Sequence, residues 1–194
     1  MSSKNYFDTV ASDWDRIRQS LFSTDLRSKA LSAVPLREGV VAADLGAGTG
    51  FLTRGLLDRG VRVIAVDQSE AMLSELRTKT GPAERLETRV GEAEKLPLED
   101  RSVDLVFANM FLHHVENPGV AIREMARILA PGGRVVLTDL DAHEHEFLRT
   151  EQHDRWLGFH RDDVEGWLRD AGFQETEIRD AEESCCSTSS CGEE

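Results

Sequence analysis

The sequence is short of positive charge. Its 194 residues include 23 Lys and Arg against 36 Asp and Glu, which gives a formal net charge of −13. Surfaces that bind nucleic acid usually carry a basic patch, and anionic membranes attract clusters of Lys and Arg. The charge balance therefore argues against both nucleic acid and anionic lipid as partners.

Long apolar runs and dispersed cysteines are lacking as well. No apolar run is long enough to span a bilayer, and the N-terminal stretch MSSKNYFDTVASDWD lacks the apolar core of a signal peptide. Cysteine is confined to Cys185, Cys186 and Cys191, an odd number clustered in the last ten residues, which argues against a disulfide framework. These absences predict a soluble, cytoplasmic chain without a membrane span. Its length predicts a single domain with a sizeable core.

What the sequence does contain is an alternation of apolar runs with helical patterns. Residues 5–34 are expected to be helical, because Phe7, Val10, Trp14, Ile17 and Leu21 recur every three or four positions. Strands are expected at 40–45, 61–67, 85–91, 103–110 and 134–140, with a weaker one at 174–181. Helices are expected at 51–60, 69–79 (with Ser69 as N-cap), 118–129 and 161–173. This alternation predicts an α/β fold: a Rossmann-like, doubly wound, mainly parallel sheet with helices on both faces.

Three glycines follow the first predicted strand in the stretch ADLGAGTG. A P-loop would continue with Lys and then Ser or Thr, whereas Phe51 and Leu52 follow here. A dinucleotide fingerprint would place its third glycine at position 51, but the glycine comes at 50. Asp44, two residues before the first glycine, would repel a pyrophosphate and attract a cation such as an ammonium group. The loop therefore predicts a cationic ligand without phosphate.

Acidic residues also end the next two strands. Asp67 lies at the end of the second strand, where a carboxylate can accept both hydroxyl protons of a ribose. Glu92 follows the third strand and can accept from an exocyclic amine such as that of adenine. A single acidic residue at a strand end is often merely solvated. Three at successive strand ends favour one shared site.

The segments ADLGAGTG, VIAVDQSEAML, GEAEKLPLEDRSVDLVFANMFLHHV and EMARILAPGGRVVLTDLD together resemble class I S-adenosylmethionine-dependent methyltransferases, in particular the subgroup that includes quinone-biosynthesis methyltransferases. The resemblance covers residues 40–140, with YFDTVASDWD as a weaker match, and implies S-adenosyl-L-methionine as the cofactor. The family's sheet usually has an antiparallel seventh strand, which the sequence does not reveal. Either the sheet is one strand short, or the chain is truncated relative to its relatives.

The resemblance also assigns roles to residues along the predicted strand ends. The methionine part of the cofactor would lie along Gly46, Ala47, Gly48 and Gly50, with Asp44 close to that end. Asp67 would hold the ribose, and Gln68 and Met72 would flank the adenosine. Adenine would contact Glu92 and the backbone of Ala93, and the carbonyl around Asn109 would accept from the ammonium group.

Histidines and carboxylates after the fourth and fifth strands are candidates for handling the methyl acceptor. The sulfonium cofactor is itself a strong methyl donor, so the protein has to orient a nucleophile and exclude water. A base is needed only if the acceptor must lose a proton. The candidate catalytic residues are His114, Asp141 and His143. Two alternatives stay open: a structural His113–His114 pair, and a metal site among Asp139, Asp141, His143 and His145, which the two histidines would share only in an extended segment.

The cysteine-bearing tail raises a separate hypothesis. Three thiols favour a soft metal or metalloid: zinc would need a fourth ligand, whereas trivalent arsenic is satisfied by three sulfurs and keeps a lone pair that can attack a methyl group. The segments DLDAHEHEF, WLGF and VEGWLRDAGF are similar to methyltransferase domains joined to arsenic-responsive repressors. The first 39 residues are too short for a winged helix, and the cysteines of arsenite methyltransferases are spread through the chain. The alternative is a polar tail with incidental thiols.

These observations predict one methyltransferase domain, with a helical lid at 1–39, a core at 40–180 and a cysteine-bearing tail at 181–194. Tyr6, Phe7 and Trp14 are candidates for a lid that excludes water. We expect an enzyme that methylates a small-molecule acceptor, which enters between the N-terminal helices and residues 139–160. The alternatives are an arsenite methyltransferase that uses Cys185, Cys186 and Cys191, a quinone-type carbon methyltransferase, and a non-catalytic sensor that binds the cofactor or a metal.

Overall fold

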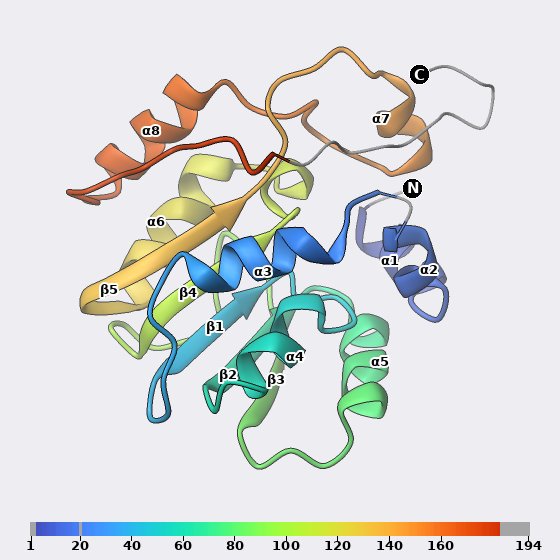
Figure 1. Cartoon of the computed structure of the whole chain (residues 1–194). Coiled ribbons are helices and arrows are strands. Elements are labelled where there is room, and N and C mark those ends of the chain that lie inside the picture. The colour runs from blue at the N-terminus through green and yellow to red at the C-terminus, as the bar shows by residue number, and fades with distance from the viewer. Residues whose placement is uncertain (1–2, 20, 183–194) are drawn as a thin grey trace.

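A single sheet of five parallel strands organises the fold (Figure 1). The computed structural model describes residues 3–19 and 21–182. The strand order is β3-β2-β1-β4-β5, so the order reverses beside β1. The strands are β1 (Val41–Leu45), β2 (Arg62–Asp67), β3 (Leu86–Val90), β4 (Val103–Asn109) and β5 (Leu129–Thr138). The predicted α/β, Rossmann-like sheet is confirmed.

Helices cover both faces of the sheet, because side chains on successive strand residues point to opposite faces. Ala42 and Val63 belong to an apolar cluster with one helix group, while the neighbouring Ala43 and Ile64 belong to a second cluster with the other. The first group is α3 (Thr24–Ser32), α4 (Phe51–Leu57) and α5 (Glu70–Thr80). The second is α6 (Pro118–Ile128) and α8 (Arg161–Asp170). Two apolar layers therefore hold the sheet rigid beneath its strand ends.

The N-terminal helical region consists of three helices. They are α1 (Ser3–Val10), α2 (Trp14–Gln19) and α3. The Ser23 side chain accepts a hydrogen bond from the backbone N–H of Asp25 and caps the start of α3. Helix α3 packs with α4, whereas α1 and α2 lie beyond the carboxyl ends of the strands (Figure 1). The expected helical segment is therefore present but broken, and only its last helix joins the core.

The outer part of the sheet departs from the sequence expectation at two points. Strand β5 begins at Leu129, earlier than predicted, and its pairing with β4 shifts register between Val103 and Leu105. The strand predicted at 174–181 is wrong, because residues 174–180 adopt no regular structure. Its large apolar side chain, Ile178, is 39% exposed, so the segment has no apolar face to bury. Within the described ranges, no strand pairs with the outer edge of β5.

Two short elements follow β4 and β5 and border the carboxyl ends of the strands. They are the 3-10 helix η1 (Leu112–His114) and α7 (Phe147–Glu151). Helix α7 was not predicted, since five residues are too few for a helical period to emerge from the sequence. None of the helices in the described part of the chain is both long and apolar enough to cross a membrane.

Candidate cofactor and acceptor site

A cavity of about 470 Å³ lies at the carboxyl ends of β1, β2 and β4. Parallel α/β sheets bind ligands at this end, beside the point where the strand order reverses. The volume falls in the range of roughly 300–1,000 Å³ that is usual for small-molecule sites. All but one of the residues assigned to the cofactor lie in its wall: Asp44, Gly46, Ala47, Gly48, Asp67, Gln68, Met72, Glu92, Ala93 and Asn109.

The glycine loop turns too tightly for residues with a side chain. Gly46 has φ +65°, and a Cβ atom added there would lie 2.3 Å from Cδ2 of Phe111. Gly50, the remaining predicted residue, is the left-handed N-cap of α4, where an added Cβ would lie 3.1 Å from Cγ of Leu76. Gly50 does not line the cavity, so it shapes the loop from behind.

Asp44 is a buried carboxylate in the cavity wall, with 2% of its surface exposed. Burial raises the pKa of Asp44 to about 7, against the opposing effect of hydrogen bonds from Thr53. Its Oδ2 accepts a hydrogen bond from the Thr53 hydroxyl at 2.6 Å. A carboxyl group that is costly to ionise becomes easier to ionise when a cation lies beside it. The site therefore favours a positively charged ligand.

Asp67 links the glycine loop to helix α5. Its Oδ2 accepts from the backbone N–H of Gly48 at 2.8 Å, and its Oδ1 accepts from that of Ser69 at 2.9 Å. The Ser69 side chain accepts in turn from the N–H of Met72, which confirms Ser69 as the N-cap of α5. Burial raises the pKa of Asp67 as well. The Asp67 carboxylate is thus held at the cavity wall, in the position expected for a ribose partner.

Arg18 is a cavity residue that the sequence reasoning missed. Its side chain is buried, and its Nε and Nη1 atoms have no hydrogen-bond partner. The guanidinium lies 4.3 Å above the ring of Phe51, and burial lowers the pKa of Arg18. Buried guanidinium nitrogens without hydrogen-bond partners in a cavity wall favour an anionic group on the ligand, because burial without a partner is costly. An arginine within an amphipathic helix is usually solvated, so nothing in the sequence distinguished this one.

Aromatic side chains of α1 and α2 close the cavity from the N-terminal side. Phe7 and Trp14 both line it, with ring centroids 5.2 Å apart in an edge-to-face contact. Phe7 also contacts the His114 ring edge-to-face at 5.0 Å. The Tyr6 hydroxyl donates to Oε1 of Gln152 at 3.0 Å and does not line the cavity.

Two hydrogen bonds join these helices to loops that border the cavity. Oδ1 of Asp8 accepts from the hydroxyl of Ser69 at 2.6 Å, next to Asp67. Oδ1 of Asp15 accepts from the hydroxyl of Thr49, which lies within the glycine loop. The ammonium group of Lys79 also lies 3.2 Å from Asp15. The N-terminal helices are therefore attached to the same loops that line the cavity.

Of the candidate catalytic residues, the structure brings only His114 to the cavity. Asp141 is exposed and forms a two-pronged ion pair with Arg161, which is the first residue of α8. His143 accepts from the backbone N–H of His145 through Nδ1 and does not line the cavity. The ion pair with α8 accounts for the place of Asp141 outside the cavity.

The metal site considered among Asp139, Asp141, His143 and His145 does not assemble in the described residues. Asp139 is buried against His113, whereas Asp141 pairs with Arg161 at the surface. The four-residue set after the fifth strand therefore does not converge on one point. Cys185, Cys186 and Cys191 lie outside the described residues, so the tail hypothesis stays a prediction.

The fold and the cavity define a Rossmann-like protein with a ligand site at its strand ends. Comparison with known proteins gives the family. The family described as "Methyltransferase domain" matches residues 43–137. The chain belongs to this family, the class I S-adenosylmethionine-dependent methyltransferases.

Individual relatives and a solved structure agree with this. Over 66% of its length the chain is 40% identical to an uncharacterized methyltransferase of Mycobacterium bovis, and covers 44% of that protein. Over 69% it is 35% identical to a demethylmenaquinone methyltransferase of Clavibacter sepedonicus, and covers 56% of it. A Haloferax volcanii methyltransferase, solved in complex with the Trm112 methyltransferase activator, matches with a TM-score of 0.77 at 28% identity, over 86% of this chain and 75% of that one. The chain spans about half the length of these curated relatives.

Proposed function

We propose that the chain binds S-adenosyl-L-methionine in the cavity at the strand ends and transfers its methyl group to a small-molecule acceptor. One observation carries the proposal. The residues that the family resemblance assigns to the cofactor lie far apart in the sequence, and all but Gly50 converge on the wall of one cavity. A second, independent feature supports it: the wall contains both a buried carboxyl group, that of Asp44, and the Arg18 guanidinium, whose Nε and Nη1 have no hydrogen-bond partner.

The charges in the wall match the two ends of an amino acid. In our proposal, the Asp44 carboxylate lies near the ammonium group of the methionine part, and the Arg18 guanidinium binds its carboxylate. Asp67 accepts from the ribose hydroxyls at the end of β2. Adenine lies beyond, beside Met72 and Glu92. The amino-acid end and the nucleoside end of the ligand thus each meet a group of opposite or complementary polarity.

The overall charge of the wall supports the same ligand over a dinucleotide. Its basic residues are Lys4, Arg18 and Arg155, and its acidic residues are Asp44, Asp67, Glu92, Glu94 and Glu116. An excess of carboxylates raises the local concentration of cations and repels phosphate groups. A cofactor with a sulfonium charge and no phosphate fits this balance.

The acceptor would occupy the remaining part of the cavity, on the side of His114. Phe7 and Phe111 exclude water there, and His114 contacts the acceptor. When bound, the cofactor supplies an electrophilic methyl group whose bond to sulfur breaks as the acceptor's lone pair forms the new bond, leaving the electron pair on sulfur. The protein's contribution is to align the acceptor and keep the site dry.

One class of acceptor, aromatic compounds such as quinols, is supported by a specific observation. Phe7, Phe111 and Val115 form an apolar part of the wall beside His114. The Clavibacter sepedonicus relative is a demethylmenaquinone methyltransferase by name. A flat apolar ring stacks well on such side chains. Arsenite methylation, through the three cysteines of the tail, stays a prediction that the same assay tests.

The test separates binding from turnover. Calorimetry with S-adenosylmethionine, its demethylated product and a nicotinamide dinucleotide should show uptake of the first two only. Asp67→Asn should weaken that uptake by about tenfold, or about 1.4 kcal/mol, while the exposed control Asp58→Asn leaves it unchanged. Uptake of the dinucleotide instead would overturn the proposal.

Turnover is then measured with methyl-labelled cofactor and a panel of quinols, small amines and arsenite. Label in any product supports an enzyme, and cofactor binding without label supports the sensor alternative. Replacing Cys185, Cys186 and Cys191 by Ser should abolish arsenite turnover alone if those thiols hold the metalloid. Unchanged arsenite methylation in that variant would remove the metalloid hypothesis.

A further inference from the structure

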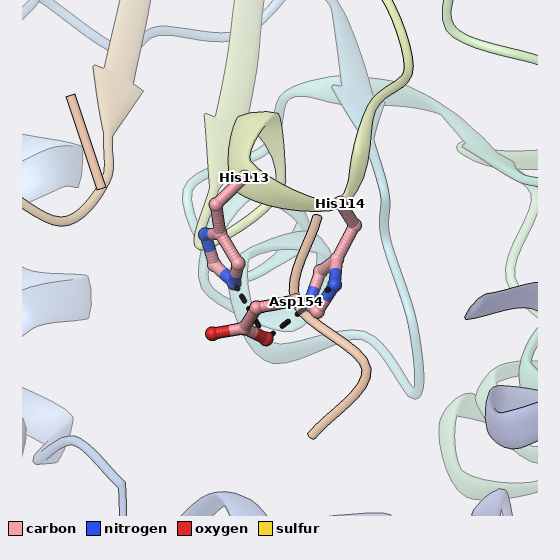
Figure 2. A group of neighbouring side chains, drawn as sticks. All are labelled: His113, His114 and Asp154. Atoms are coloured by element: carbon pink, nitrogen blue, oxygen red, sulfur yellow. Dashed lines mark ion pairs between the residues drawn. The ribbon is translucent and has the colours of Figure 1, made fainter. Parts of the chain in front are cut away.

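Three polar side chains that the proposed reaction does not fully use meet in the wall behind the cavity. His113 and His114 belong to η1, and Asp154 lies in the loop after α7. Figure 2 shows one carboxylate oxygen of Asp154 facing a nitrogen of each imidazole ring. Their side chains are 5%, 13% and 3% exposed, respectively. The cluster is therefore shielded from bulk water.

The distances within the cluster are too long for hydrogen bonds. Oδ1 of Asp154 lies 3.8 Å from Nε2 of His113 and 3.7 Å from Nδ1 of His114. Nδ1 of His114 is buried and has no hydrogen-bond partner. Buried polar atoms are nearly always partnered, and hydrogen bonds to nitrogen rarely exceed about 3.2 Å. The three atoms thus surround a point where a further atom would satisfy all of them.

The second ring nitrogen of His113 is already engaged, which decides where the lone pair of that ring lies. Nδ1 of His113 lies 2.7 Å from Oδ1 of Asp139. Because a carboxylate only accepts, this nitrogen carries the proton and Nε2 of a neutral ring keeps a lone pair. Nδ1 of His114 is buried without a hydrogen-bond partner, so a neutral ring that carries its proton on Nε2 leaves a lone pair on Nδ1. With both rings neutral and in these tautomers, the two nitrogens that face Asp154 offer lone pairs to a metal ion.

The backbone holds these groups in place before any ligand arrives. The N–H groups of Arg155 and Trp156 both donate to the carbonyl of His113, at 3.0 and 3.1 Å. His153 has φ +59°, a left-handed conformation that is uncommon for a residue with a side chain, directly before Asp154. This loop is thus fixed against η1 in a constrained conformation, as is frequent at functional sites.

Asp139 supports the cluster from behind. Besides contacting His113, it accepts from the backbone N–H of Leu112 at 2.7 Å and of Leu140 at 2.9 Å. Histidines that bind metals commonly donate their second ring nitrogen to a carboxylate in this way, which orients the ring and makes the ligating nitrogen more basic. Asp139 takes this supporting position.

We propose that Nε2 of His113, Nδ1 of His114 and Oδ1 of Asp154 bind a divalent transition-metal ion of the Zn²⁺ type. The three atoms lie within 4.8 Å of one another, so a point equidistant from them is at most about 2.4 Å from each. A closure of a few tenths of an ångström would reach the 2.0–2.2 Å bonds that zinc forms with histidine and carboxylate. Two histidines and one carboxylate also leave positions on the ion open for a further ligand.

The location of the site gives it a role beyond stability. His114 and Arg155 line the cofactor cavity, so the ion would lie in the cavity wall. If the acceptor binds beside His114, which rests on the proposed function, an open position on the ion could take an oxygen or sulfur atom of the acceptor. Binding of the ion itself is independent of methyl transfer and is measured without the cofactor.

The test uses Zn²⁺ as the probe and a chain in which Cys185, Cys186 and Cys191 are replaced by Ser, so that thiols do not contribute. Calorimetry should show one Zn²⁺ per chain, and the melting temperature should rise with Zn²⁺. Co²⁺ in place of Zn²⁺ should give visible absorption bands typical of nitrogen and oxygen ligands. Asp154→Asn and His114→Ala should each weaken binding at least tenfold, whereas the exposed control His160→Gln should not.

The outcomes separate this site from its alternatives. No Zn²⁺ uptake by the cysteine-free chain would mean that water or an ion pair occupies the cluster, and would overturn the proposal. Uptake that survives both Asp154→Asn and His114→Ala would place the ion elsewhere, with the same consequence. Circular dichroism of each variant shows whether it is folded. Loss of methyl transfer with Zn²⁺ binding retained would count against the proposed function alone.

Discussion

Replacing Asp44 by Asn removes a carboxyl group that is costly to ionise in the folded chain. Burial raises the pKa of Asp44 to about 7, whereas its ordinary value is 3.8. The folded state therefore binds this proton more tightly than the unfolded state. The resulting stabilisation is complete below pH 4 and is lost as the pH rises through about 7. Asparagine does not titrate, so the variant lacks this pH dependence.

The size of the effect follows from the two pKa values. At ~1.4 kcal/mol per pKa unit, the difference between 3.8 and about 7 corresponds to about 4 kcal/mol above pH 7. Relaxation and water penetration reduce this figure, so we expect a difference of about 2 kcal/mol. The amide oxygen of Asn can still accept from the Thr53 hydroxyl, which makes a hydrogen bond of 2.6 Å in the parent chain. Asp44→Asn should therefore be more stable than the parent at pH 8 and by a clearly smaller margin at pH 5, because the unfolded carboxyl group ionises near pH 4 and the folded one only near pH 7.

Urea unfolding of both chains at pH 5, 6, 7 and 8 measures this difference directly. Asp58→Asn, an exposed aspartate at the end of α4, is the matched control and should follow the parent at every pH. The same variant should bind S-adenosylmethionine about tenfold more weakly, because the ammonium group loses its charged partner. An Asp44→Asn chain that is no more stable than the parent at pH 8, or equally stabilised at pH 5, would refute the reasoning.

Three further predictions concern the walls of the cavity. Gly46→Ala should lower the melting temperature, because a side chain at φ +65° costs about 1–2 kcal/mol and the new Cβ meets Phe111. The additional substitution Phe111→Ala should restore part of the lost stability. If it restores none, the contact with Phe111 is unimportant. Arg18→Gln should weaken calorimetric binding of S-adenosylmethionine at least tenfold but not that of methylthioadenosine, which lacks the amino acid; equal weakening of both would place Arg18 elsewhere. Asp15→Ala should release the N-terminal helices to trypsin at a cost of about 1 kcal/mol, and unchanged cleavage kinetics would show that the Thr49 bond does not fasten them.

The sheet and the acidic residues at its strand ends could be predicted from local patterns, whereas most of the other residues assigned to the cavity wall came from the family resemblance. Alternation along each strand decides which face a side chain takes, so the two apolar layers follow from neighbours such as Ala42 and Ala43. In a parallel sheet, residues at successive strand ends meet at one edge, which brings Asp44 and Asp67 to one cavity. The weak strand at 174–181 failed because a single apolar residue, Ile178, cannot anchor it.

Features that depend on the path of the chain through space were not predictable in this way. Arg18 differs from a solvated arginine only through its contact with Phe51, which lies in another helix. Asp154 lies near His113 because the loop after α7 packs against η1. No periodic pattern in the sequence predicts this contact. Asp141 follows β5 as expected, but Arg161 of α8 pairs with it outside the cavity. Sequence patterns place strand ends, whereas the pairing of loops decides which side chains meet.

The attachment of the N-terminal helices has a consequence for kinetics. Asp8 accepts a hydrogen bond from Ser69, and Asp15 accepts one from Thr49. Helices α1 and α2, which cover the cavity, are therefore attached to the loops that border it. A bound nucleoside that orders those loops would also order helices α1 and α2. Release of the ligand would then require both hydrogen bonds to these helices to break. The rate of ligand release, rather than the rate of methyl transfer, would then limit turnover.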